Sequence, residues 1–296
     1  MAFWTVFDRT CSGLLARRSN VPTGAMIGDL HLHSHHSDGL LGPSEVVQRA
    51  SSIGLKVLSL TDHDSREGWQ EMSDHCQAAG VRWVPGIELS TTHADQEIHL
   101  LGYFPSDSGT PVLNEHLTRF QQRRRKRVED ILRQLEENGI PWDAQQVLKG
   151  ITCRSPGRPH VARALVEHSL ASNVGQAFRR FLKKGAQGWV PSTYPATMEM
   201  IRLIHAERGL AVMAHPGLGI PNEVLVDLAS QGLDGVEAFH SSHKPSLVKK
   251  YLHLADQLGL MVTGGSDCHG PMPGGMRMGK TRLESPFLER FLERLT

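Results

Sequence analysis

Histidine and carboxylate side chains stand at spacings that suit metal binding in this 296-residue sequence, which contains 17 histidines. His31 and His33 are two residues apart, and Asp267 and His269 repeat that spacing near the C-terminal end. Side chains two residues apart on a strand point to the same side, so each pair can grip one ion. Asp38 follows His33 closely in the segment HSHHSDG. These pairs, together with separate carboxylates elsewhere, predict a site that holds more than one ion.

The predicted ligand atoms are nitrogen and oxygen, without a thiolate among them. The four cysteines show no C-x-x-C spacing, which argues against a zinc-ribbon site and a disulfide framework and favours a reducing cytosol: Cys11, Cys76, Cys153 and Cys268. Cys268 stands between two predicted ligands, and side-chain alternation turns it the other way, so we expect it to be packed. The ligand atoms favour Mn²⁺, Fe or Zn²⁺ in a polynuclear catalytic site over a closed structural zinc site.

Short apolar runs alternate with helical patterns from residue 26 onward, which predicts an α/β fold with a parallel sheet or a β/α barrel. Seven runs are predicted strands: 26–33, 56–63, 81–90, 97–104, 210–215, 235–240 and 261–267. Each ends in, or carries near its end, a residue able to bind metal or exchange protons: His31 and His33; Asp62, His63 and Asp64; Glu88; His99; His215; Glu237 and His240; Asp267 and His269. Because the carboxyl ends of barrel strands open on one face, these side chains should converge at one mouth. For Glu237 a supporting or structural role stays open beside direct binding.

Helical patterns fill the segments between most strands. One helix is predicted from Pro43 to Gly54, with proline near its start and glycine at its end. Others are predicted near 66–79, 197–208, 222–231 and 245–258, and three more at about 114–138, 158–169 and 173–184.

The predicted elements divide the chain into three parts. Residues 1–25 form a loose N-terminal extension that is a poor secretory signal, with Met26 as the working start. Segments 26–106 and 191–296 form a metal-dependent barrel. Residues 107–190 contain no good strand, and we expect them to form a helical insert that caps the substrate site.

The composition indicates a soluble globular protein. Hydrophobic residues are 39% and charged residues 21% of the chain, and the formal net charge is +1. No apolar run is long enough for a membrane span, so we expect a cytoplasmic protein without membrane contact. A charge near zero excludes gross attraction to nucleic acid but allows a local basic patch. The run QQRRRKR (121–127) is such a patch or, alternatively, a solvated helix face.

Six motifs together resemble the PHP (polymerase and histidinol phosphatase) family of metal-dependent phosphoesterases. They agree with the family in order and spacing: DLHLHSHHSDG (29–39), LTDHD (60–64), PGIELS (85–90), EIHLLGY (97–103), AHPG (214–217) and GSDCHG (265–270). Within the family, GRPHVARALVE (157–167) and the helical insert resemble the branch that hydrolyses 3′,5′-nucleoside bisphosphates and trims RNA 5′ ends. The resemblance covers about 26–285.

The resemblance implies a distorted seven-stranded β/α barrel with two or three divalent metal ions, manganese foremost and iron or zinc as alternatives. Carried over position by position, it assigns nine residues: His31, His33, Glu88 and Asp267 to the first ion; Glu88, as a bridge, with His99 and His215 to the second; and Asp38, His63 and His269 to the third.

The resemblance also implies a hydrolase that acts on phosphate esters by metal-activated hydroxide. Its substrates would be 3′,5′-nucleoside bisphosphates, which lose the 3′-phosphate, and 5′-phosphorylated RNA oligonucleotides, which are trimmed 5′→3′. No obligate protein partner is expected. Asp267 and His240 are the predicted catalytic residues. The leaving ribose oxygen needs a proton or a metal, and either His240 or a third metal ion would provide it.

Substrate contacts are predicted on two segments. Arg158 and His160 begin a helical pattern, and a helix N-terminus with an arginine fork is an anion site for a second phosphate or the RNA backbone. Lys280, and with it Arg277, follows the last ligands in a Gly-rich loop and could reach the substrate.

Three other functions stay open. One is a small-molecule phosphatase of the histidinol-phosphate type or a general phosphodiesterase, which would not need Arg158 and His160. Another is a non-catalytic PHP scaffold of the kind found inside polymerases, against which the intact ligand set argues. The third is amide-bond hydrolysis by a related metallo-barrel, where Glu88 would stand in place of a bridging carbamylated lysine.

Overall fold

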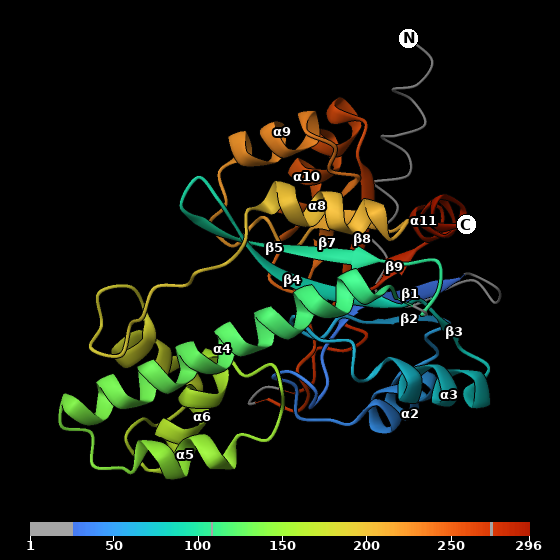
Figure 1. Ribbon diagram of the computed structural model, residues 1–296. Helices are drawn as coiled ribbons and strands as arrows, with labels where there is room; N and C mark the ends of the chain where they lie inside the picture. Colours follow the sequence, from blue (N-terminus) through green and yellow to red (C-terminus); the bar gives the residue numbers. More distant parts are fainter. Residues whose placement is uncertain (1–25, 108, 273–274) are drawn as a thin grey trace.

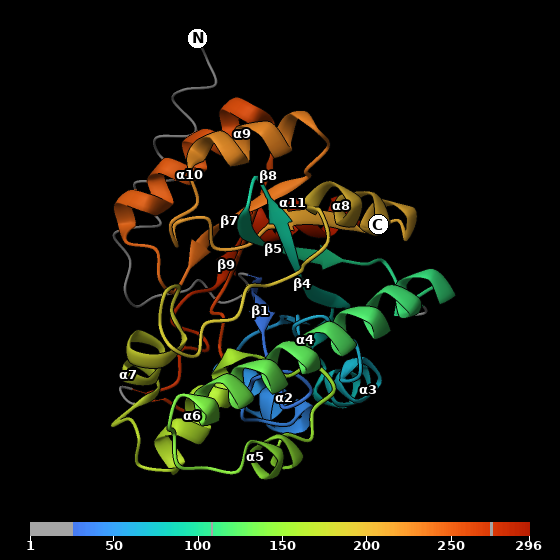
Figure 2. The same ribbon diagram turned by 60° about the vertical axis from the view of Figure 1, so that its left-hand side comes forward.

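The computed structural model describes residues 26–107, 109–272 and 275–296, so the predicted extension 1–25 lies outside the described residues. Two β-sheets form the centre of the molecule (Figure 1). Helices α8 to α11 lie along the larger sheet, α2 and α3 lie along the smaller one, and α4 to α7 project to one side (Figures 1 and 2). Within the described residues, no helix combines the length and the apolarity that crossing a membrane requires.

The smaller sheet has the strand order β3-β2-β1-β9. Its strands are β1 (Ile27–Leu32), β2 (Val57–Leu60), β3 (Arg82–Trp83) and β9 (Leu283–Glu284). β1, β2 and β3 run parallel, and β9 runs antiparallel to β1. The carboxyl ends of β1 and β2 therefore lie together.

The larger sheet has the order β4-β5-β6-β7-β8. Its strands are β4 (Gly86–His93), β5 (Gln96–Tyr103), β6 (Leu210–Met213), β7 (Gly235–His240) and β8 (Met261–Gly265). β6, β7 and β8 are parallel, whereas β5 is antiparallel to both of its neighbours. Isolated parallel bridges, Leu32 with Cys268 and His63 with Glu88, join the two sheets near the carboxyl ends of β1, β2 and β8.

The α/β class is confirmed, but the predicted barrel of seven strands differs from the nine strands in two sheets seen in the described residues. The predicted strand 81–90 divides into β3 and β4 at Pro85, which has no N–H to continue a ladder. Ala94 and Asp95 both have positive φ, of 47° and 60°, and make a two-residue hairpin turn. This turn reverses the chain between β4 and β5, where a parallel barrel would require a crossover. The two-residue strand β9 was not predicted.

The helices against the sheets follow the predicted segments closely. They are α2 (Pro43–Ser52), α3 (Trp69–Ala79), α8 (Thr197–Ala206), α9 (Asn222–Ser230), α10 (Pro245–Leu258) and α11 (Phe287–Leu295), the last of which was not predicted. α2 begins at Pro43, and the Glu45 carboxylate accepts the Gly42 N–H, which caps the first turn. Cys268 is packed in the apolar cluster beneath α2 and α3, as predicted.

The segment between β5 and α8 is helical throughout its described elements. These are α4 (Pro111–Glu137), α5 (Ala144–Gly150), which was not predicted, α6 (Arg158–Glu167), α7 (Val174–Ala177) and a π-helix (Phe178–Leu182). They surround an apolar cluster of their own that includes Leu135, Trp142 and Phe181. The first turns of α4 instead bury Leu113 and Leu117 in the main core. Helix α4 thus connects the helical segment to the sheets, and the predicted domain boundaries stay predictions.

Candidate metal centre

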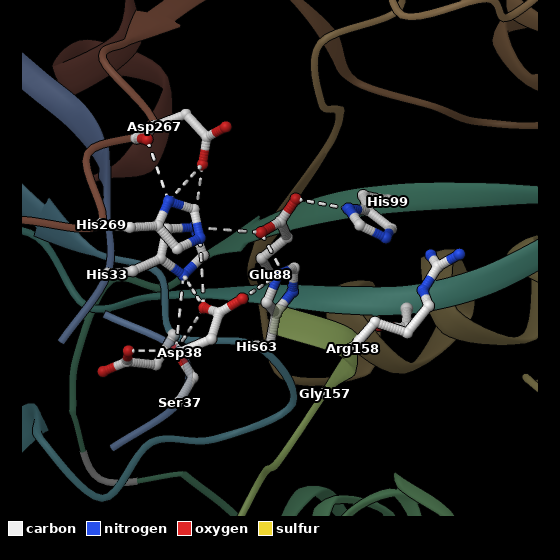
Figure 3. A network of polar contacts seen from close by, with 12 residues as sticks. His33, Ser37, Asp38, His63, Glu88, His99, Gly157, Arg158, Asp267 and His269 are labelled. Carbon is white, nitrogen blue, oxygen red and sulfur yellow. Dashed lines mark hydrogen bonds and ion pairs between the residues drawn. The ribbon is translucent and has the colours of Figure 1, made fainter. Parts of the chain in front are cut away.

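Side chains from both sheets converge where the carboxyl ends of the strands meet. His31 lies on β1, and His33 directly follows it. Glu88 pairs with Leu101, and Ser90 with His99, in the antiparallel β4–β5 ladder. This register makes Glu88 and His99 diagonal neighbours on one face of the hairpin. Strand geometry thus brings residues that are distant in sequence to one point (Figure 3).

The Glu88 carboxylate is the centre of the group. It is 1% exposed and lies against five imidazoles. One oxygen, Oε2, is 3.3 Å from Nε2 of His31, 3.2 Å from Nε2 of His33 and 3.1 Å from Nδ1 of His63. The other, Oε1, is 2.8 Å from Nδ1 of His99 and 3.0 Å from Nε2 of His215. One carboxylate oxygen thus faces each half of the cluster, which is the geometry a bridging ligand needs.

Two aspartates complete the cluster around His269. Nε2 of His269 is 3.1 Å from Oδ1 of Asp38, and Nδ1 is 3.5 Å from Oδ1 of Asp267. The same Asp267 oxygen lies 3.2 Å from Nε2 of His33. All nine residues predicted as metal ligands are therefore in one connected group.

The cluster fits cations because its buried lone pairs converge without hydrogen-bond partners. Nε2 of His31, Nε2 of His33, Nδ1 of His63 and Oε2 of Glu88 are buried and find no partner in the described part of the chain. Such atoms are costly to bury unless something else binds them. Ligand atoms gather within 4.8 Å of one another in overlapping groups: His33, Asp38, His63 and His269; His31, His33 and Glu88; His63, Glu88 and His99; and His31, Glu237 and His240. Nitrogen and carboxylate oxygen are donors that Mn²⁺, Fe and Zn²⁺ accept.

Without a bound ion, imidazoles and carboxylates of the protein offset each other's charge in this cluster. Burial opposes the charged imidazolium, but surrounding carboxylates outweigh it and raise the pKa of His31 and His99 well above the usual value. Burial also opposes ionised carboxylates, yet the imidazoles hold the pKa of Glu88 and Asp267 well below the usual range. At His63 burial prevails and lowers the pKa. The carboxylates are thus ionised, and cations can replace protons on the imidazoles.

Strained backbone positions coincide with the cluster. Asp64, His215 and Asp267 have positive φ angles of 47°, 28° and 52°. A non-glycine residue in this region costs about 1–3 kcal/mol and persists only when its surroundings fix it. Each of the three follows the carboxyl end of a strand. The strained backbone thus occurs at positions where the chain leaves a strand beside the cluster.

Glu237 supports two of the predicted ligands. It is fully buried, and its Oε1 lies 2.9 Å from Nδ1 of His31. Its Oε2 accepts the backbone N–H of His215 at 2.9 Å. The first contact keeps the proton of His31 on Nδ1 and leaves Nε2 free toward Glu88, as carboxylates behind metal-binding histidines do. These two contacts favour the supporting role for Glu237 over direct binding.

His240 lies on the same face as Glu237, although the two are three positions apart in the sequence. A register shift between Glu237 and Phe239 makes this possible, because it adds one residue to β7 opposite β8. Nδ1 of His240 accepts the Ser242 N–H, which leaves Nε2 as the N–H donor of the ring, 3.3 Å from Oδ2 of Asp267. His240 thus presents an N–H donor at the edge of the cluster.

Asp62 fixes the loop that carries Asp38. Its Oδ1 accepts the Ser34 N–H at 2.7 Å and the Ser37 hydroxyl at 2.5 Å, and its Oδ2 accepts the Ser34 hydroxyl at 2.6 Å. Asp62 is 1% exposed. Its place in LTDHD made it a candidate for chemistry, and the structure gives it the role of holding the β1 loop.

A cleft of about 210 Å³ opens from the cluster toward the helical segment. We call it the arginine cleft, lined among others by His99, His269, Arg127, Arg158 and Tyr194. Arg158 lies beside His99 (Figure 3), and its Nη2 is 3.2 Å from Oε1 of Glu97. Glu97 also lies 3.3 Å from Nε2 of His99. The sequence did not indicate Glu97, although its position two residues before His99 placed it on the same strand face. Arg127 belongs to the basic run 121–127, for which the sequence left a patch or a solvated face open, whereas no pattern pointed to Tyr194.

His160 lies elsewhere, with its ring turned to the helix start. Its Nδ1 accepts the Gly157 N–H at 3.1 Å, and its Nε2 is 3.3 Å from Sγ of Cys153. Burial, with the nearby charge of Arg163, lowers the pKa of His160 to about 4. His160 is therefore a neutral capping residue of α6 in this structure, and its predicted contact with an anion stays a prediction.

The loop after β8 holds the other predicted substrate contacts. Nη1 of Arg277 donates to the Ser241 hydroxyl at 3.3 Å, which places the guanidinium next to the residue that follows His240. Lys280 follows in the same loop before β9, and its substrate role stays a prediction.

The residues of the basic run 121–127 do not all face solvent, because Arg124 points into the protein. Arg124 is 6% exposed. Its Nη1 donates to Asp64 and to the Ser90 hydroxyl, and its Nε donates to the Pro156 carbonyl oxygen. This arginine ties α4 to the metal-centre loops.

Comparisons with known proteins agree with this geometry. Residues 29–184 match the PHP domain family. A 5′-3′ exoribonuclease of Haemophilus influenzae is 34% identical over 258 residues, which are 85% of this chain and 93% of the relative. A 3′,5′-nucleoside bisphosphate phosphatase of Chromobacterium violaceum is 31% identical over 261 residues, 86% of this chain and 90% of the relative. A Bifidobacterium adolescentis structure named for a metal-dependent phosphoesterase superposes with a TM-score of 0.83 at 27% identity, covering 91% of this chain and 96% of that one.

Proposed function

This chain belongs to the PHP domain family, and we propose that it removes the 3′-phosphate of 3′,5′-nucleoside bisphosphates and trims 5′-phosphorylated RNA from its 5′ end. It is a hydrolase that acts on phosphate esters. The observation that carries the proposal is the meeting of unpartnered buried ligand atoms with an arginine-lined cleft. The cluster suits a scissile phosphate, and the arginines suit a second phosphate at the far end of the same nucleotide.

We assign the nine clustered residues to three ions as the family resemblance implies, with Glu88 shared between the first and second. Bound divalent ions, of which we propose Mn²⁺ with Fe and Zn²⁺ as alternatives, would lower the pKa of water and neutralise phosphate oxygens. The residues around them orient the substrate. We propose that Arg158 and Arg127 bind the 5′-phosphate, since guanidinium forks match phosphate geometry.

His240 is suited to hold a phosphate oxygen rather than to protonate the leaving group. Its Nδ1 accepts the Ser242 N–H, so the ring faces the cluster with its Nε2–H donor. A neutral imidazole is a hydrogen-bond donor but a very weak acid. The proton for the 3′-oxygen therefore comes from another source in this proposal. Nε2 of His240 lies 3.3 Å from Oδ2 of Asp267, so this ring atom faces the cluster before substrate binds.

The helical segment supplies substrate specificity in this proposal, because Arg127 and Arg158 both lie on it. We propose that α4 to α7 act as the substrate cap and that the protein works in the cytoplasm.

A side-by-side assay tests the function. Protein reconstituted with Mn²⁺ is given adenosine 3′,5′-bisphosphate, a 5′-phosphorylated RNA oligonucleotide and histidinol phosphate. We expect the first two to be hydrolysed and the third to be a poor substrate. Preference for histidinol phosphate would replace the proposal with the small-molecule phosphatase, and inactivity on all three with bound metal would favour a scaffold. The double variant His31→Ala with His33→Ala should lose both turnover and metal, and full turnover in it would refute the site.

A further inference from the structure

RNA needs more space at the predicted metal centre than a nucleoside bisphosphate does. The inference rests on the proposed function, in which both substrates lose the bond between phosphorus and the 3′-oxygen of the first nucleoside. The oxygen of water bonds to phosphorus, the 3′-oxygen leaves and takes a proton, and the phosphate stays on whatever lay beyond it. In the bisphosphate nothing lies beyond that phosphorus. In RNA the second nucleotide is attached to that phosphorus. Trimming therefore requires space for this nucleotide beside the cluster, away from the cleft that holds the 5′-phosphate.

The structure has such a space. A cleft of about 460 Å³ lies between α5, α6 and the loop that follows β1. We call it the α5–α6 cleft, lined among others by His35, Ser37, Val147, Ile151, His160 and Arg163. Its volume is in the range of small-molecule sites, which is about 300–1,000 Å³.

The two clefts flank the loop that carries Asp38. Asp38 lines the arginine cleft, whereas Ser37 and Gly39 line the α5–α6 cleft. Figure 3 shows Ser37 and Asp38 on one side of His63 and Arg158 on the other. A chain that passes the cluster can therefore place consecutive nucleotides in different clefts.

The lining of the α5–α6 cleft suits a nucleotide. Nη1 of Arg163 donates to the Asp38 carbonyl oxygen at 3.0 Å, which fixes a guanidinium next to a predicted metal ligand. This bond uses one of five N–H donors, so the group can also meet a phosphate oxygen. Val147 and Ile151 provide apolar surface, and His35 is an exposed imidazole that the metal cluster does not use. Unpaired RNA bases stack on such rings and apolar surfaces.

We propose that the α5–α6 cleft binds the second nucleotide of an RNA substrate, with its base against His35 and Val147. The arginine cleft then receives the terminal 5′-phosphate of either substrate. Each cleavage leaves a new 5′-phosphate on the shortened RNA, which is the group that the arginine cleft accepts. The two clefts thereby account for stepwise trimming in the 5′→3′ direction.

The experiment compares variants on a bisphosphate and on RNA. Val147→Trp fills the cleft, and His35→Ala removes the stacking surface. Arg163 is left unchanged because it contacts the loop of Asp38. The matched control is Val112→Trp on α4, where Val112 is 54% exposed and outside both clefts. Values of kcat/KM are measured with adenosine 3′,5′-bisphosphate and with a 5′-phosphorylated diadenylate, after metal content and melting temperature have been checked.

We expect kcat/KM for the dinucleotide to fall about tenfold in each cleft variant, the effect of one lost base stack, with little change for the bisphosphate. Equal losses on both substrates would overturn the proposal, because the cleft would then hold the nucleoside that they share. Unchanged dinucleotide cleavage in both variants would overturn it too. If Val147→Trp does not fold, the kcat/KM values of His35→Ala on the two substrates decide the test. Wild-type protein that hydrolyses only the bisphosphate refutes the cleft, whereas inactivity on both substrates refutes the proposed function.

Discussion

Which nitrogen of each imidazole carries the proton decides what that residue can do. His31 is held with Nδ1 toward Glu237 and Nε2 toward Glu88. His240 is held the other way, because the Ser242 N–H occupies its Nδ1. The first ring is suited to be the ligand that we propose and the second to be a donor, although both are buried histidines on strands of the two sheets.

Glu237→Gln should weaken metal binding without removing any ligand. An amide oxygen accepts one of the two N–H groups that Glu237 now serves, so either the His31 ring or the His215 backbone loses its acceptor. We expect metal affinity to fall roughly 10–100-fold, the usual effect of losing a carboxylate behind a metal-binding histidine. Metal content after dialysis against a buffered ion series measures it. Glu223→Gln, at an exposed position on α9, is the control, and equal metal retention in both variants would contradict the role of Glu237.

Metal loading near pH 8 should release protons. Burial opposes the imidazolium of His269, but Asp38 and Asp267 outweigh it and raise its pKa to about 10 in the metal-free protein. The pKa of His31 and of His99 is raised as well. These rings are therefore protonated before they bind metal and deprotonated afterwards, so affinity rises with pH. A pH indicator in weak buffer records the release, and metal uptake without it would show that the rings are already neutral.

At the scale of elements, the site depends on how closely β1 and β8 approach. Gly265 ends β8 directly against His31, and a Cβ at this position would collide with the His31 Cβ and lie 2.5 Å from its backbone nitrogen. The Asp267 N–H also donates to the His31 carbonyl oxygen at 2.9 Å. The glycine thus allows the predicted ligands of the two strands to lie close together.

Gly265→Ala should separate these strands and disturb the first metal site. We expect a loss of about 1–3 kcal/mol in the free energy of unfolding, as for an overpacked core, together with reduced metal content. Denaturant unfolding and metal analysis measure the two effects. Gly150→Ala is the control, because a Cβ there meets no atom within 4 Å. A Gly265→Ala protein with normal stability and full metal content would show that β1 and β8 can move apart without loss of stability or of the site.

At the scale of the whole molecule, the predicted ligands connect the two sheets. His31 lies on β1, and His33 and His63 follow β1 and β2. Glu88, His99 and His215, by contrast, belong to the larger sheet or follow one of its strands. Among the described residues the sheets are joined there by isolated bridges. Ions bound at this junction would therefore stabilise the molecule as a unit.

Chelation should lower the melting temperature. A ligand at 100 times its dissociation constant stabilises the folded state by about 2.7 kcal/mol, which corresponds to a shift of several degrees. Differential scanning calorimetry with and without chelator measures the shift. The variant Glu88→Gln, which lacks the central bridging carboxylate, should show little response. An unchanged melting temperature of the wild-type protein after addition of chelator would mean that bound ions do not stabilise the junction of the two sheets.

The sequence by itself determined the chemistry of the centre and most of the elements that carry it. Spacing of two on a strand and the carboxyl ends of successive strands are local properties, so they could be read from the order of residues. The pairs around His31 and Asp267, and the helix that begins at Pro43, followed from such local rules.

Only the tertiary structure decided the contacts that depend on register and on packing between distant segments. The hairpin of β4 and β5 replaced a parallel barrel because Ala94 and Asp95 adopt a reversed turn, which an aspartate favours but an alanine does not signal. The burial of Arg124, the tautomer of His240 and the two clefts beside Asp38 arise where the helical segment or a shifted strand meets the sheets. Such contacts join residues far apart in the chain, and no local pattern records the distance at which they meet.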